Sequence, residues 1–287
     1  MLRPDRTAGT VVLIHGAWQG SWVWERLAPL LDGLGLDVIA VDLPGNGTDD
    51  TPPEAVTLDL YVDHIGEAIA DASGPITLVG HSGGGLTATA AAERYRERIA
   101  GVAYVAGMML PSGISFADLL VDVGAAEKGL VGIGPFLTRS PDGVSTSVPA
   151  DAAADIFLSD MPRDEALRLV RRLTPQPRGG REMAANWTPQ RYGALPRLYV
   201  ECADDRSVAL TLQRRMQELV PGAQSVTLHT GHAPQVSAPA ALADALLPFL
   251  LQRKEEKAGT GTPTAEAAQS SFTGCSPSHA DRDNPPR

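Results

Sequence analysis

The pentapeptide at residues 80–84, Gly-His-Ser-Gly-Gly, fits the pattern Gly-x-Ser-x-Gly, in which a serine lies on a sharp turn. An apolar stretch at 75–79 precedes it and an Ala-rich stretch follows it, which predicts a strand before the turn and a helix after it. Small residues on both sides let these elements approach closely, while the serine adopts a strained backbone that exposes its oxygen. Ser82 is therefore a candidate nucleophile.

A serine hydroxyl is a weak nucleophile until a neighbouring base accepts its proton. Of the six histidines, His232 lies in the loop after the last predicted strand, at the carboxyl edge where the active sites of parallel sheets gather. His81 adjoins the serine, but successive side chains on a sharp turn diverge. His229 is expected to pack at the end of the strand, and His15 to be buried and shape a loop. His232 is the predicted general base, against the alternative of a solvated loop histidine.

The base needs a carboxylate that holds its tautomer and stabilises the imidazolium. With this type of serine turn the chain order is serine, acid, histidine, so the acid should lie between Ser82 and His232. The loop after the predicted strand at 197–202 contains Asp204 and Asp205, and either could serve. The strand at 99–106 is not followed by a carboxylate, which removes the other usual location.

Two backbone N–H groups should bind the negative charge that develops on the carbonyl oxygen. We expect one from Gly83, directly after the nucleophile, and one from Ala17, in the loop after the first strand. Trp18 could then line the acyl pocket. Met108 and Trp187 are further candidates for an apolar substrate pocket, although core packing explains them equally well.

These residues need a scaffold of alternating strands and helices. Short apolar stretches predict strands at 10–14, 37–41, 76–79, 99–106, 197–202 and 225–229. Helices are predicted at 22–34, 58–72, 84–96, 209–220 and 239–251, the first with an apolar face formed by Leu27, Leu30, Leu31 and Leu34. The alternation predicts an α/β fold, with a mostly parallel sheet of about six strands covered by helices on both faces.

The alternation stops between residues 110 and 192, where Gly, Pro and short amphipathic stretches replace clear strands. This interval is too long for an ordinary loop and predicts an inserted helical cap. The α/β core then consists of residues 1–109 and 193–252. Residues 253–287 are polar and rich in Gly, Ser, Pro and charged side chains, which predicts a disordered tail.

The composition limits the class of partner. The 287 residues include 24 Lys and Arg against 34 Asp and Glu, and this net charge of −10 argues against nucleic acid. Cys202 lies in a predicted strand and Cys275 in the tail, so they form neither a disulfide framework nor a metal cluster. No apolar stretch approaches the ~20 residues that span a bilayer, and no signal sequence is evident. We expect a soluble, cytoplasmic monomer or homodimer without a membrane partner.

The chain resembles the α/β-hydrolase superfamily in motifs that occur in the expected order over residues 10–252. They are Ile-His-Gly-Ala-Trp at 14–18, Asp-Leu-Pro-Gly-Asn-Gly at 42–47, the serine turn, Asp204-Asp205 and Gly231-His232. The likeness is greatest to the branch of plant methyl-ester esterases, hydroxynitrile lyases and related bacterial esterases, through residues 15–31 and 199–205. This resemblance places the catalytic aspartate at Asp205.

Two positions depart from the lyases of this branch. Those enzymes carry a threonine after the first loop histidine and a lysine after the catalytic histidine, where this chain has Gly16 and Ala233. Lyase chemistry is therefore disfavoured. The resemblance does not extend to the cap, which largely determines substrate choice in this fold.

We predict a serine hydrolase of carboxylic esters, lactones or thioesters, which forms an acyl-enzyme through Ser82, Asp205 and His232. Its substrate is a small molecule, and it needs no metal or organic cofactor. Two alternatives stay open. One is a biosynthetic cyclase, decarboxylase or thioesterase that uses the same site, and the other is a non-catalytic ligand-binding protein on the same fold.

Overall fold

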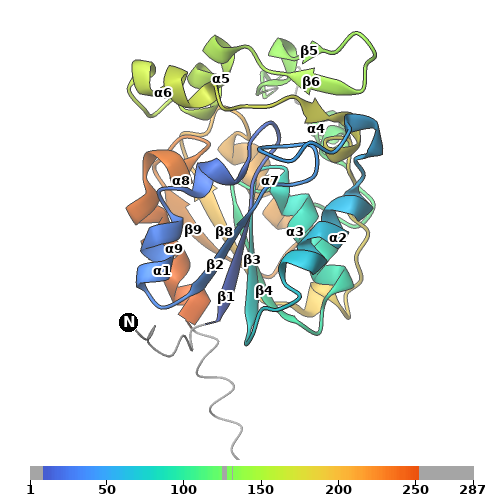
Figure 1. Ribbon diagram of the computed structural model, residues 1–287, viewed down its shortest axis with the longest axis vertical. Coiled ribbons are helices and arrows are strands. Elements are labelled where there is room, and N and C mark those ends of the chain that lie inside the picture. Colours follow the sequence, from blue (N-terminus) through green and yellow to red (C-terminus); the bar gives the residue numbers. More distant parts are fainter. Residues whose placement is uncertain (1–8, 125–127, 131, 252–287) are drawn as a thin grey trace, which may run out of the picture.

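The computed structural model describes residues 9–124, 128–130 and 132–251. A six-stranded sheet in the order β2-β1-β3-β4-β8-β9 forms its centre, and every neighbouring pair is parallel (Figure 1). The strands are β1 (Thr10–Ile14), β2 (Asp37–Val41), β3 (Ile76–His81), β4 (Ile99–Val105), β8 (Arg197–Cys202) and β9 (Ala223–Leu228). Because the strands are parallel, the loops that follow β1, β3, β8 and β9 all leave the same edge of the sheet. The predicted α/β-hydrolase sheet is confirmed.

Helices cover both faces of this sheet (Figure 1). Successive residues of β1 point to opposite faces, since Val12 and Ile14 join one buried cluster while Val11 and Leu13 join the other. Outside the interval 110–192, the helices that bury residues in the first cluster are α2 (Leu58–Ala68), α3 (Gly84–Arg94) and α7 (Leu210–Leu219). Those of the second are α1 (Ala28–Gly33), α8 (Pro234–Ser237) and α9 (Pro239–Leu251).

The first predicted helix, at 22–34, is divided in the structure. A short 3-10 helix, η1 (Ser21–Trp24), is followed by a turn and then by α1. Pro29 lies in the first turn of α1, where its missing N–H does no harm, whereas inside a continuous helix it would break the hydrogen-bond ladder. The predicted apolar face is correspondingly smaller, because Leu27 and Leu31 are buried but Leu30 and Leu34 are 40% and 44% exposed.

The cap is not purely helical, contrary to the prediction. It contains the helices α4 (Phe116–Asp122), α5 (Ala150–Phe157) and α6 (Arg163–Val170). It also contains a three-stranded antiparallel sheet of β5 (Thr138–Arg139), β6 (Ser145–Ser147) and β7 (Gln176–Pro177). Strands of two or three residues are too short to show an alternating pattern, so the sequence gives no sign of them. Figure 1 shows these elements above the edge of the main sheet at which the strands end.

Four further 3-10 helices connect these elements: η2 (Pro53–Ala55), η3 (Gly134–Phe136), η4 (Arg178–Gly180) and η5 (Tyr192–Ala194). The tail predicted to be disordered, with Cys275, lies outside the described residues. Within the described ranges, no helix has both the length and the apolar character needed to cross a bilayer. Cys202 is buried and not in a disulfide among these residues.

The close packing of α3 against β1 gives a stability prediction. A Cβ at Gly84 would lie 2.4 Å from the carbonyl oxygen of His15 and 2.6 Å from that of Ile14. Gly84→Ala should therefore lower the free energy of unfolding by about 1–3 kcal/mol, measured by urea denaturation. Gly33→Ala is the matched control, because a Cβ at Gly33 meets nothing within 4 Å. Equal stability of the two variants would contradict the packing argument.

Candidate active site

Ser82 lies on a sharp turn between β3 and α3, with a positive φ of 51°. This conformation is costly for a residue with a side chain, so the surrounding structure must maintain it. The Ser82 N–H donates to the carbonyl oxygen of Val105 at 3.2 Å, and the Ser82 carbonyl oxygen accepts from the N–H groups of Gly85 and Met108. The strained serine backbone expected from the sequence is confirmed.

The loop after β9 brings His232 to the carboxylate of Asp205. The distance from His232 Nδ1 to Asp205 Oδ2 is 2.8 Å, and both side chains are buried. Asp205 Oδ1 accepts from the backbone N–H groups of Ser207 and Val208, at 2.7 and 2.9 Å, so the carboxylate is fixed in place. Asp204, its neighbour, is exposed. The geometry thus favours Asp205 of the two aspartates that the loop offered.

Ser82 and His232 line the same cavity. No hydrogen bond joins the serine hydroxyl to the imidazole within the described ranges. Such bonds are often long without substrate and tighten when it binds. Because Nδ1 of His232 is engaged by Asp205, Nε2 is the nitrogen left to accept a proton from Ser82.

The backbones of Ala17 and Gly83 lie side by side at this cavity. A Cβ at Gly83 would be 3.7 Å from the Ala17 nitrogen, and both residues line the cavity with Ser82. In the described part of the chain, neither backbone N–H donates a hydrogen bond. The next N–H, that of Trp18, is already bound to Gln176 Oε1 at 2.9 Å. This arrangement supports Ala17 and Gly83 as the two oxyanion donors.

His15 is buried beneath the Ala17 loop and holds it by two hydrogen bonds. The Leu43 N–H donates to His15 Nε2 at 3.0 Å, so the proton of the neutral ring is on Nδ1, which donates to the Gly16 carbonyl oxygen at 2.8 Å. Burial lowers the pKa of His15 to about 4, because desolvation penalises the charged ring. A second proton on His15 would have to bind Nε2, where it would point at the Leu43 N–H, itself a donor. His15 therefore supports the loop, as expected.

The His81 side chain makes its hydrogen bonds to His232 and Gln19 and thereby holds the backbone of His232. Its Nε2 donates to the carbonyl oxygen of His232 at 2.8 Å, and its Nδ1 lies 3.0 Å from Gln19 Oε1. The Gly16 N–H donates to the same Gln19 oxygen at 3.1 Å. Burial and the nearby His232 hold the pKa of His81 well below its usual range. The sequence did not single out Gln19, whose position only the fold reveals.

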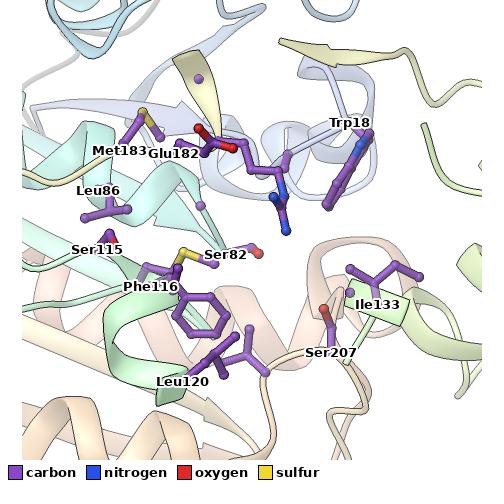
Figure 2. A pocket seen from close by; sticks show the side chains of 18 of the residues that line it. Trp18, Ser82, Leu86, Ser115, Phe116, Leu120, Ile133, Glu182, Met183 and Ser207 are labelled. Carbon is purple, nitrogen blue, oxygen red and sulfur yellow. The ribbon is translucent and has the colours of Figure 1, made fainter. Parts of the chain in front are cut away.

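Beneath the cap, the cavity has a volume of about 210 Å³ and a largely apolar wall (Figure 2). Trp18 and Met108 are part of this wall, so the structure puts both beside Ser82. The other large apolar side chains that line it are Leu86, Phe116, Leu120, Ile133, Phe157, Met183 and Val208. The Phe157 ring stacks on Trp18, with centroids 6.0 Å apart, and is tilted against the His232 ring at 5.6 Å.

Trp187 does not line this cavity, and its predicted substrate contact is wrong. Its Nε1 donates to the carbonyl oxygen of Leu110 at 3.0 Å, and its ring packs edge-on against Tyr192 at 5.1 Å. The indole thus closes the base of the cap against the core. His229 also differs from expectation, because it is exposed at the end of β9.

Gln213 is a supporting residue that the sequence reasoning missed. It is fully buried on α7, where it accepts from the Cys202 N–H and donates to the carbonyl oxygens of Cys202 and Val208. These bonds span the ends of the loop that carries Asp205. The sequence does carry one sign of this role: Gln213 lies next to Leu212 and one turn before Met216, among the apolar positions of α7. Among the described residues, no cluster of three His, Cys, Asp or Glu side chains suits a metal ion.

The chain matches the family model described as the alpha/beta hydrolase family over residues 11–245. It is 27% identical to a pyrethroid hydrolase of Sphingobium wenxiniae, over 85% of this chain and 88% of that protein. It is 26% identical to methylesterase 9 of Arabidopsis thaliana, over 82% and 96%. The crystal structure of polyneuridine aldehyde esterase superposes with a TM-score of 0.74 at 27% identity, over 84% and 98%. The resemblance to the esterase branch is confirmed.

The buried, neutral His15 predicts a pH-dependent stability. The unfolded chain binds a proton at His15 near pH 6.5 and the folded chain only near pH 4. Lowering the pH through this window should therefore favour unfolding, by up to roughly 3 kcal/mol from His15 alone. The depressed pKa of His81 acts in the same direction.

Urea denaturation between pH 7 and pH 4.5 measures this loss, and NMR titration assigns it to His15. An imidazole of His15 that titrates near pH 6.5 in the folded protein would contradict the prediction.

Proposed function

Because this chain belongs to the alpha/beta hydrolase family, we propose that it hydrolyses carboxylic esters through an acyl-enzyme on Ser82. One observation carries this proposal. A buried Asp205–His232 pair, 2.8 Å apart, lies at the same cavity as a serine on a strained turn. Two adjacent backbone N–H groups at that cavity complete the parts that acyl transfer needs.

In the proposed reaction His232 Nε2 accepts the hydroxyl proton as Ser82 Oγ attacks the carbonyl carbon. The carbonyl electron pair moves to oxygen, where the N–H groups of Ala17 and Gly83 bind it. The intermediate collapses as the bond to the alcohol breaks and His232 returns its proton to the leaving oxygen. Water, deprotonated by His232, then releases the acid by the same steps. Asp205 keeps the imidazole oriented and stabilises its charged form.

The relatives support an ester as the substrate class, since two of the three are named as esterases. The proposed substrate is a small molecule that fits beneath the cap. We also propose that the reaction needs no metal or organic cofactor and that the protein acts in the cytoplasm. Its oligomeric state, monomer or homodimer, stays a prediction.

The proposal predicts a sharp difference between two neighbouring aspartates. With p-nitrophenyl butyrate as substrate, Asp205→Asn should lower kcat about 10⁴-fold, because the imidazole loses its tautomer and its counter-charge. Ser82→Ala and His232→Ala should lower kcat by about 10⁴-fold or more. Asp204→Asn is the matched control, and it should stay close to the unmodified protein because Asp204 is exposed. Equal effects at Asp204 and Asp205 would contradict the assignment.

A fluorophosphonate probe separates this proposal from its alternatives. Labelling of Ser82 together with ester turnover supports the hydrolase. Labelling without turnover of simple esters favours a biosynthetic enzyme that uses the same site. A folded protein that shows neither labelling nor turnover favours a non-catalytic ligand-binding protein.

A further inference from the structure

Arg181 brings a positive charge into a cavity whose wall is otherwise mainly apolar. It follows η4 in the cap and lines the cavity together with Ser82 and Trp18. Its guanidinium carbon lies 5.9 Å from the centroid of the Trp18 ring, in a cation–π arrangement. Within the part of the chain that the structure describes, its side chain makes no hydrogen bond or ion pair.

Arg181 is exposed, and its lack of protein partners distinguishes it from the structural arginines of the same chain. Among the described residues the exposed Arg168 also lacks such partners, but only Arg181 of the two lines the cavity. Arg197 is buried, and its guanidinium donates to several carbonyl oxygens, including those of Gly193 and Pro221 at 3.0 and 2.7 Å. Arg172 forms a two-pronged pair with Glu25. A guanidinium stays charged in proteins and presents five donors, so one that faces a cavity without an acceptor is suited to an anionic ligand.

The charges around Arg181 leave this region of the cap positive. Glu182 also lines the cavity, but its carboxylate pairs with Arg178 at 3.8 Å. Desolvation lowers the pKa of Arg181, Glu182 raises it, and the nearby positive charge of Arg139 lowers it again. Arg139 thus lies near Arg181, and Arg178 offsets the charge of Glu182, in a chain whose net charge is −10. An anion bound to Arg181 would balance this local excess.

The Trp18 ring, over which the Arg181 guanidinium lies, is held in place by hydrogen bonds. Trp18 Nε1 donates to the carbonyl oxygen of Thr146 at 3.0 Å, and the Trp18 N–H donates to Gln176. The ring therefore holds a defined position directly after Ala17, one of the two proposed oxyanion donors. An anion held by Arg181 over this ring is placed close to the reacting carbonyl. Figure 2 shows Trp18, Glu182 and Ser82 around the same cavity.

From this arrangement we infer that the ester carries a carboxylate, which Arg181 binds while the apolar wall encloses the rest of the molecule. The inference rests on the proposed ester hydrolysis and specifies its substrate class. A planar guanidinium can bind a carboxylate through two parallel hydrogen bonds, which a neutral ester of the same shape cannot form. The carboxylate can belong to the acid or to the alcohol part of the ester, and the test includes both.

Two pairs of esters of matched shape test the inference at low ionic strength by pH-stat. The first pair compares monomethyl glutarate, whose carboxylate is in the acid part, with the neutral methyl 5-methylhexanoate. The second pair compares a 3-(butanoyloxy)propanoate salt, whose carboxylate is in the alcohol part, with the neutral 3-methylbutyl butanoate. In at least one pair, we expect kcat/KM for the anionic ester to exceed that of its neutral partner about 10-fold or more.

Arg181→Gln should lower kcat/KM for that anionic ester about 10–100-fold, mainly through KM, and remove the preference within the pair. Arg181→Lys should restore part of it, because the charge remains but the two-pronged geometry is lost. Arg168→Gln is the matched control: Arg168 is an exposed arginine of the cap that does not line the cavity, and its loss should leave the preference unchanged.

The outcomes distinguish this inference from the proposed function. Turnover of the neutral esters, with no preference for either anionic ester, overturns the inference and leaves the hydrolase standing. Equal losses in Arg181→Gln for both members of a pair also overturn it. No turnover of any ester, with no fluorophosphonate labelling of Ser82, overturns both.

Discussion

The active site depends on the close approach of the serine turn to the loop after β1. Three glycines permit it. A Cβ at Gly16 would lie 2.8 Å from the Ser82 Cβ, one at Gly80 would lie 2.7 Å from the Gly84 carbonyl oxygen, and one at Gly84 would meet the carbonyl of His15. Because these backbones are nearly in contact, the N–H groups of Ala17 and Gly83 border one cavity. Without this approach the proposed oxyanion donors would not lie beside Ser82.

Buried polar groups join this loop to the proposed base. His81 donates to the His232 carbonyl oxygen, and Gln19 lies between His81 and the Gly16 N–H. His15 fixes the same loop from below. Desolvation keeps His15 and His81 neutral, so they can order the site without adding charge to it. In the proposed reaction the positive charge forms on His232, where Asp205 would stabilise it.

Trp18 connects the site to the cap. Its carbonyl oxygen accepts from the Thr174 N–H, its backbone N–H binds Gln176, and its indole binds Thr146. The small sheet of the cap is therefore joined by hydrogen bonds to the loop that carries Ala17. Because Trp18 and Ser82 line the same cavity, the geometry of the cap also affects the surroundings of Ser82.

The sequence alone determined the alternation of strands and helices, because burial on a sheet leaves a local periodic pattern. It also determined the serine turn and predicted the order of serine, acid and base, because these depend on short motifs. It did not choose between Asp204 and Asp205 without a family resemblance, and it gave Trp187 a wrong role. Which side chains surround the cavity, Arg181 among them, was decided only by tertiary structure, since segments far apart in the chain form that wall through packing that no local pattern records.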